Sequence, residues 1–185
     1  MNPIAIARWG AVALALAVSS VSAADQEPPR TGPVIEQFGP VYDVARPDFP
    51  TPTNATYRAV FDVAPSPDAA DALNPRIESL ARFLNMHARA GVSPGQIKLA
   101  LVVHGAAGKD MLSNPAYKAR FGVENPNTAL LVALQSKGVR VVLCGQTAAH
   151  RGFRRDELAP GVEVALSAMT ALVALQSEGY QLISF

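Results

Sequence analysis

Short apolar runs alternate, from residue 57 to the C-terminus, with segments whose apolar residues recur every three or four positions. A continuous apolar run is typical of a strand buried on both faces of a sheet, and the longer spacing is typical of a helix with one buried face. This alternation predicts a single three-layer α/β/α domain with about five mostly parallel strands. The strands are expected at Tyr57–Val63, Ile97–Val103, Val139–Leu143, Val162–Ala165 and Tyr180–Phe185.

Four helices are expected between these strands. Two of them open with an Asn-Pro pair, at Asn74 and Asn125, which places proline in the first turn, where its missing N–H is not needed. Both end at a glycine, Gly91 and Gly138, which is the favoured residue just after a helix. The other two helices are expected at Gln146–His150 and Ser167–Glu178.

One hexapeptide, Leu-Val-Ala-Leu-Gln-Ser, occurs twice, at residues 131–136 and 172–177. Each copy is followed by a charged residue, a glycine and an expected strand. A single repeated unit does not make a solenoid, which needs three or more stacked copies. The repeat instead suggests equal structural roles for the two helices.

The N-terminal residues 1–23 carry a single charge, Arg8, followed by an apolar stretch from Trp9 to Val18 and a run of small residues. This order is typical of a secretory signal peptide cut after Ala23 or Ala24. The apolar stretch is also shorter than the roughly 20 residues that span a bilayer. We therefore expect a cleaved leader, a periplasmic location and a mature chain without a membrane segment.

Residues 24–56 form a proline-rich segment with seven prolines between Pro28 and Pro52. Proline removes backbone donors and favours extended geometry, so this segment is expected to be an arm or linker and not a domain. Its apolar residues, among them Ile35 and Phe38, are too many for a freely solvated tail. The arm is expected to lie along the domain or a neighbouring subunit, with a disordered leader as the alternative. Residues 57–185 then form the domain.

The charge balance argues against nucleic acid and anionic membranes as partners. Loss of Arg8 with the leader leaves 15 basic residues of the original 16 against 15 acidic residues, so the mature net charge is zero. A neutral domain lacks the basic surface that such partners need. One cysteine and three scattered histidines give no metal-ligand spacing, and the glycines after residue 104 lack the phosphate-binding loop pattern. No metal or cofactor is expected.

The best candidates for chemistry are Cys144 and His104, which come at the ends of two expected buried strands. Ligands and reactive groups of open α/β sheets lie beyond the carboxyl ends of the strands. If the two strands are neighbours, the thiol and the imidazole share one rim. The alternatives without a chemical role are that Cys144 is a small buried hydrophobic residue and that His104 makes only a structural hydrogen bond.

Four neighbouring residues complete the candidate site. Gly105 and Gly145 follow the two strands directly, and Gly145 is expected to leave room for a substrate beside the sulfur. Gln146 opens a helix whose free N–H groups favour the thiolate. Arg151 adds positive charge that can hold an anion, although a solvated helix end explains it equally well.

Several segments, in this order and spacing, carry a resemblance to a known family. They are Lys98–Gly105, Asn125–Asn127, Val141–Gln146 with the pair Arg151-Gly152, and Pro160–Val162 with Ala165–Ser167. From about Tyr57 to the C-terminus the chain resembles the DsrE/DsrF family. The resemblance implies a flavodoxin-like domain that associates into dimers, trimers or hexamers, and a link to sulfur relay through a persulfide on one cysteine. That cysteine ends a buried strand a few residues before an Arg-Gly pair, which matches Cys144.

The sequence thus leads to a hypothesis and an alternative. In the hypothesis, a periplasmic protein accepts sulfane sulfur on Cys144 from a small donor or a sulfur-carrier protein and holds or relays it, while His104 tunes the thiol. In the alternative, the chain is a non-catalytic oligomeric binding or assembly subunit in which Cys144 is buried and inert. A third, weaker possibility is a redox sensor that dimerises through Cys144.

Overall fold

The computed structural model describes residues 27–184. The expected signal peptide, residues 1–23, and the last residue of the expected C-terminal strand, Phe185, lie outside this range. Among the described residues, no helix has both the length and the apolar character needed to cross a membrane.

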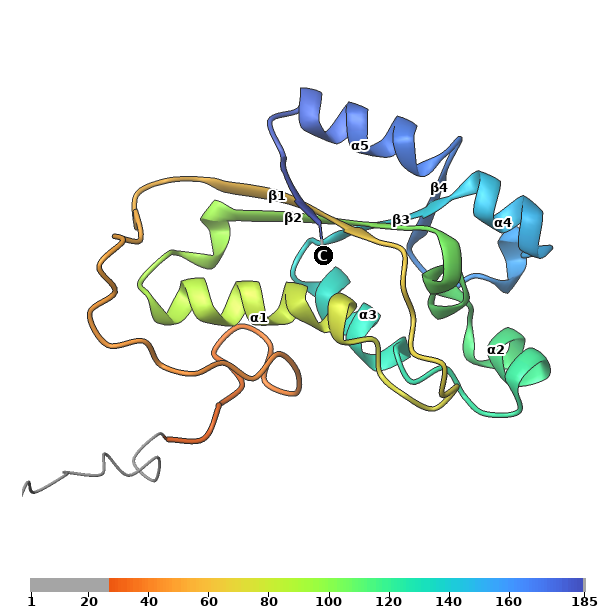
Figure 1. The fold of residues 1–185 in the computed structure, drawn as a ribbon, viewed down its shortest axis with the longest axis horizontal. Coiled ribbons are helices and arrows are strands. Elements are labelled where there is room, and N and C mark those ends of the chain that lie inside the picture. Colours follow the sequence, from red (N-terminus) through yellow and green to blue (C-terminus); the bar gives the residue numbers. More distant parts are fainter. Residues whose placement is uncertain (1–26, 185) are drawn as a thin grey trace, which may run out of the picture.

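A five-stranded sheet forms the centre of the molecule, with the strand order β4-β3-β2-β1-β5 (Figure 1). Every pair of neighbouring strands is parallel, which confirms the predicted α/β class. Three strands have the expected bounds, while the third begins and ends one residue later and the last begins one residue later. The strands are β1 Tyr57–Val63, β2 Ile97–Val103, β3 Arg140–Cys144, β4 Val162–Ala165 and β5 Gln181–Ser184.

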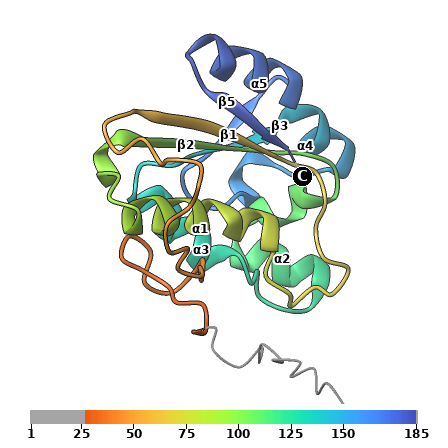
Figure 2. The same ribbon diagram turned by 60° about the vertical axis from the view of Figure 1, so that its left-hand side comes forward.

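Helices cover both faces of the sheet, as Figures 1 and 2 show: α1 and α3 lie on one face and α5 on the other. The α-helices are α1 Pro75–Arg89, α2 Asn114–Phe121, α3 Thr128–Ser136, α4 Gly145–Arg151 and α5 Ala168–Ser177. Three short 3₁₀ segments join them: η2 Pro94–Gln96, η3 Gly105–Met111 and η4 Arg155–Glu157.

The start of α3 differs from the prediction. The helix was expected to open at the Asn125-Pro126 pair, but it begins at Thr128. The Asn125 side chain accepts a hydrogen bond from the Asn127 N–H at 2.9 Å and donates to the carbonyl of Leu112 at 2.7 Å. The Asn125 side chain therefore forms a turn before the helix and does not cap it. Asparagine can adopt either arrangement.

The helix α2 was not predicted. Only Tyr117 is buried among its eight residues, so the segment lacks the repeated apolar positions that mark a helix in the sequence. The Tyr117 hydroxyl donates to the Ala70 carbonyl at 2.8 Å, which fixes the helix to the loop after β1. A tertiary contact, and not a repeated apolar pattern, therefore holds α2 in place.

The two faces of the sheet have cores of different size. The face under α1 and α3 carries the larger apolar cluster, and the face under α5 carries a smaller one that includes Val60, Val102, Val142 and Cys144. The repeated hexapeptide shows the difference, because Leu131 of α3 is 1% exposed while its counterpart Leu172 of α5 is only partly buried. The two helices are therefore not equivalent: within residues 27–184, α3 shares its face with α1, whereas α5 covers the smaller cluster.

The described part of the arm lies against α1 of the same chain (Figures 1 and 2). Val34, Ile35 and Val41 are buried there. The buried Asn85 side chain of α1 accepts from the Val34 and Ile35 N–H groups and donates to the carbonyls of Ile35, Phe38 and Gly39. One amide thus pairs with several buried backbone groups of residues 34–39, and an antiparallel bridge between Arg30 and Val41 pairs others.

Candidate functional site

Cys144 and His104 lie at the carboxyl edge of two neighbouring strands. Cys144 is the last residue of β3, and His104 directly follows β2. Val103 pairs with Leu143, so the next residue of each strand, His104 and Cys144, reaches the same level. Side chains alternate between the faces of a sheet, and Cys144 packs with Val142 and Val102 on the α5 face. The extended backbone of His104 continues this alternation, so both side chains belong to one face.

The His104 imidazole binds a carboxylate on the strand beyond. Its Nε2 lies 3.0 Å from Oδ1 of Asp62, which stands on β1 and is partly buried. The sheet order puts β1 on one side of β2 and β3 on the other. The hydrogen bond of His104 is therefore made on the side away from Cys144. Sequence reasoning missed Asp62, although an acid between Phe61 and Val63 in an expected buried strand was a usable signal.

The sulfur of Cys144 is enclosed by apolar side chains and N–H groups. Cys144 is 6% exposed and packs in the cluster that holds Ala168 and Ala171 of α5. Burial raises the pKa of the thiol, but the polar groups beside the sulfur, namely the Thr147 N–H and hydroxyl and the N–H groups of Ala168 and Gln146, outweigh it. The pKa of Cys144 therefore lies below its usual range, which favours the thiolate.

Thr147 joins the ends of β2 and β3. Its Oγ1 accepts a hydrogen bond from the Gly105 N–H at 3.1 Å, and its hydroxyl is among the groups that lower the pKa of Cys144. Its methyl group lies against η3 so closely that a Cβ at Gly108 would come within 2.7 Å of it. Thr147 was not predicted, because a threonine in a short helix carries no signal in the sequence.

Gly145 has a packing role. A Cβ at this position would come within 2.4 Å of the Ala165 carbonyl oxygen, at the end of β4. The space on that side of Gly145, where room for a substrate was expected, is thus filled by backbone. Gln146 next to it is exposed, and its side chain donates to the Leu166 carbonyl at 3.3 Å.

Arg151 is not brought to the sulfur. It is the last residue of α4, whereas Cys144 caps the first turn, and it is exposed. A helical rise of 1.5 Å per residue separates the two positions by about 10 Å along the helix. Among the described residues, no group of three or more His, Cys, Asp or Glu side chains could hold a metal ion.

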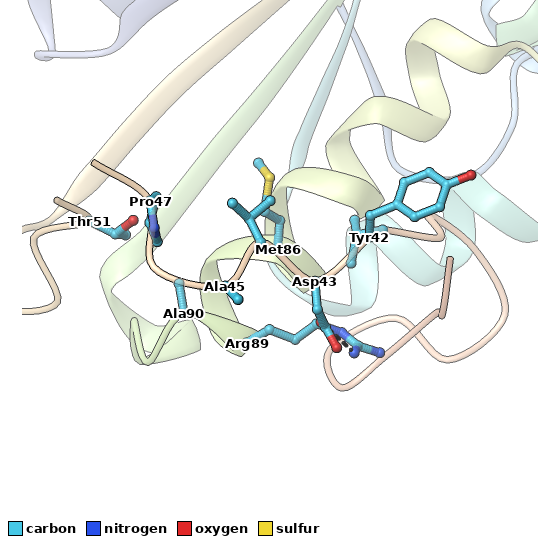
Figure 3. Close-up of a pocket in the computed structure, with 10 residues that line it drawn as sticks. Tyr42, Asp43, Ala45, Pro47, Thr51, Met86, Arg89 and Ala90 are labelled. Carbon is cyan, nitrogen blue, oxygen red and sulfur yellow. Dashed lines mark hydrogen bonds and ion pairs between the residues drawn. The ribbon is translucent and has the colours of Figure 1, made fainter. Parts of the chain in front are cut away.

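Two hollows bear on where a ligand could bind. One of about 600 Å³ lies between the arm and the end of α1, as Figure 3 shows, with Tyr42, Met86 and the paired Asp43 and Arg89 in its wall. None of its lining residues belongs to the rim that carries Cys144. The other, of about 240 Å³, lies between α5 and strands β3 and β4, and its wall includes Ala165, the strand partner of Cys144.

Comparison with known proteins gives a family and two similar structures. The model of the DsrE/DsrF-like family matches residues 57–185. The solved structures of MTH1491, a protein of unknown function from Methanobacterium thermoautotrophicum, and of the ychN protein from E. coli are each 19% identical to this chain. Each comparison covers 70% of this chain and 99% of the other, with TM-scores of 0.54 and 0.51. At this identity they show a shared fold. No curated protein matches the sequence.

Proposed function

This chain belongs to the DsrE/DsrF-like family, and from that premise we propose that it is an exported sulfur-handling protein. Cys144 accepts a sulfane sulfur from a small donor and holds it, or passes it on, as a persulfide. The observation that carries this proposal is the position of Cys144 at the carboxyl end of β3 and the start of α4, where neighbouring N–H groups lower the pKa of a thiol that burial alone would raise.

The chemistry needs a thiolate, since the thiolate and not the thiol attacks sulfur. With thiosulfate as donor, the Cys144 sulfur forms a new S–S bond to the outer sulfur, and the S–S bond of thiosulfate breaks with its electron pair leaving on sulfite. Cys144 then carries an S–S⁻ group. When an acceptor thiolate attacks that outer sulfur, the electron pair of the Cys144 S–S bond returns to the Cys144 sulfur. No external oxidant or reductant is consumed in either step.

The expected leader supports an exported protein. Residues 1–23 have the order of charge, apolar stretch and small residues that directs secretion. A single cysteine cannot form a disulfide within its own chain, so the thiol remains open to sulfur chemistry in an oxidising compartment. N-terminal sequencing of the protein from a periplasmic fraction is expected to begin at Ala24 or Asp25. A chain that begins at Met1 contradicts a cleaved leader, and a protein that is missing from the periplasmic fraction contradicts export.

The direct test is the intact mass of the mature protein after treatment with thiosulfate or polysulfide, beside a Cys144→Ser variant. The expected result is a gain of one sulfur that a reductant removes and the variant lacks, which is the reversible behaviour of a persulfide. A wild-type chain that gains no sulfur, or a variant that gains as much, overturns the proposal.

A second candidate function is a non-catalytic assembly subunit. It is favoured by the low exposure of Cys144 and by the exposed apolar side chains on and beside α5: Leu166 at 73%, Met169 at 75% and Val173 at 65%. Under this reading α5 packs against another subunit and the thiol is inert. The folded protein would then be oligomeric, and its thiol would resist iodoacetamide until it is unfolded. Light scattering and alkylation of folded protein separate the two functions.

A further inference from the structure

His104 and Asp62 form a hydrogen-bonded pair on the same face of the sheet as Cys144. Val60 of β1 packs in the cluster that contains Cys144, so the alternation of side chains along β1 puts Asp62 on this face as well. Nε2 of His104 lies 3.0 Å from Oδ1 of Asp62, and the two side chains are 34% and 24% exposed. The pair is therefore held in a fixed geometry and is open to a molecule that reaches this edge.

The second ring nitrogen of His104, Nδ1, faces away from Asp62. A carboxylate only accepts hydrogen bonds, so the neutral imidazole carries its proton on Nε2, and Nδ1 keeps a lone pair. The two nitrogens of an imidazole point in nearly opposite directions. Because β1 and β3 flank β2, a ring whose Nε2 turns to β1 has Nδ1 on the side of β3, where Cys144 lies at the same level. Within residues 27–184, Nδ1 has no hydrogen-bond partner.

We propose that His104 accepts the proton of the thiol to which Cys144 passes its sulfur, and that Asp62 is the positioning residue that holds the imidazole for this step. The inference rests on the proposed function and names its acceptor: a neutral thiol of ordinary acidity, which loses a proton before it attacks. Neighbouring strands lie about 4.8 Å apart. An acceptor sulfur bound at this edge is therefore within reach of both the imidazole and the sulfur of Cys144.

Atoms and electrons balance in this step. The S–H proton of the acceptor moves to Nδ1 of His104, and the electron pair left on the acceptor sulfur forms a new S–S bond to the outer sulfur of the Cys144 persulfide. The S–S bond of the persulfide breaks, and its electron pair returns to the Cys144 sulfur. The imidazolium donates from Nε2 to the Asp62 carboxylate, which stabilises the new charge. Solvent then takes the proton, and no oxidant or reductant is consumed.

His104 is the best-placed proton acceptor among the described residues. The chain has two other histidines, of which His87 belongs to α1 on the opposite face and His150 is exposed near the end of α4. The helix that covers this face, α5, has no charged side chain between Ala168 and Ser177. Glu163 of β4 pairs with the arginine that begins β3, at the other end of that strand.

The test measures how fast small thiols remove a methylthio group that methyl methanethiosulfonate has placed on Cys144, with intact mass as the readout. At neutral pH mercaptoethanol is almost entirely protonated, so His104→Gln should slow its reaction about tenfold or more, because the variant has lost the general base. Trifluoroethanethiol is more acidic and is already partly thiolate, so the same variant should stay within about twofold of wild type. Glutamine keeps an N–H for Asp62 and cannot take the proton.

The dependence on thiol and on pH separates proton transfer from a structural role. At high pH, where mercaptoethanol is itself ionised, wild type and His104→Gln should react equally fast. Asp62→Asn should give the same pattern with a smaller loss, about threefold, because the imidazole remains but is no longer held in one orientation. A His104→Gln variant that is slow with both thiols at every pH has a distorted site, and this result overturns the proposal. So does His104→Gln with wild-type rates.

His150→Gln is the matched control, because this exposed histidine lies near the far end of α4 and its loss should leave both rates unchanged. An equal loss in this variant overturns the proposal. If His104→Gln does not fold, His104→Asn makes the same comparison.

The methylthio group is loaded without a sulfane-sulfur donor, so the two proposals fail separately. A wild-type protein that takes up no sulfur from thiosulfate or polysulfide refutes the proposed function alone, and equal rates in wild type and His104→Gln refute the role of His104 alone. A Cys144 that cannot be loaded in the folded protein overturns both.

Discussion

His104 binds Asp62 through Nε2 at 3.0 Å, across the strand pair β1 and β2 and on the far side of β2 from Cys144. A carboxylate only accepts hydrogen bonds, so the neutral imidazole carries its proton on Nε2 and leaves Nδ1 as the acceptor. The imidazole and the sulfur therefore share a rim without the hydrogen bond between them that a thiol–imidazole pair would need.

Asp62→Asn is expected to change which nitrogen of His104 carries the proton. An amide can donate as well as accept, so the preference for Nε2–H should be lost. Nitrogen NMR of the neutral imidazole measures the two forms directly. His87 is the internal control, because its Nδ1 lies 2.8 Å from the Phe83 carbonyl, which only accepts, and its Nδ1–H form should persist in both proteins. A His104 spectrum that Asp62→Asn leaves unchanged contradicts the assignment.

Gly145→Ala is expected to destabilise the fold by about 2 kcal/mol, the usual cost of forcing an extra group into a packed site. The added Cβ would lie 2.4 Å from the Ala165 carbonyl oxygen, and a backbone atom cannot move aside as a flexible side chain can. Gly95→Ala is the control, since the nearest atom to its Cβ, Oγ of Ser93, is 3.8 Å away. Urea unfolding measures both, and equal effects would show that close packing at Gly145 is not the cause.

Much of the fold follows from local pattern, and the exceptions have identifiable physical causes. The strands β1 and β2 have the predicted bounds because most of their residues are apolar, as expected for strands buried between two layers of helices. The helix α2 was not predicted because a single buried residue, Tyr117, gives no repeated apolar pattern in the sequence. The pattern also placed Cys144 and His104 at one edge, since parallel strands end together.

The finer structure of the site could not be read from the sequence. Whether His104 turns toward Asp62 or Cys144 depends on how side chains of three strands meet, and the hydrogen bond between Thr147 and Gly105 joins residues that are 42 positions apart in the sequence. Arg151 shows the opposite case. It is close to Cys144 in the sequence, but the two residues lie at opposite ends of α4 and are therefore separated in space. Two residues that are close in sequence can therefore belong to different surroundings when a helix separates them.

Asn85→Ala is expected to detach the arm and to cost about 3 kcal/mol, because it leaves several buried backbone groups of residues 34–39 without partners. Amide hydrogen exchange at Val34 and Ile35 should rise by more than it does in the sheet. Ser79→Ala, at a partly exposed position of the same helix, removes one local hydrogen bond and should have little effect. An arm that stays protected in Asn85→Ala would show that apolar contacts alone hold it.

Asp110 gives the protein a specific pH dependence. It is 1% exposed, and its carboxylate accepts from the Ser66 hydroxyl at 3.0 Å and from the Asn74 amide at 2.8 Å. Burial raises the pKa of Asp110, and these hydrogen bonds only partly offset the rise. The folded protein therefore binds the proton of Asp110 more tightly than the unfolded chain does. Its contribution to stability is greatest below the pKa of the unfolded chain and is lost as the pH rises through the pKa of the folded state.

Asp110→Asn is expected to remove this dependence, because an amide is neutral and can still accept from Asn74 while it donates to the Ser66 oxygen. Relative to wild type, the variant should gain stability as the pH rises from acid to neutral, since only the wild type then buries a charge. Urea unfolding of both proteins across this range measures the difference. A difference that stays constant with pH, or a variant that becomes relatively weaker toward neutral pH, would mean that the Asp110 carboxylate is better stabilised in the folded protein than its burial implies.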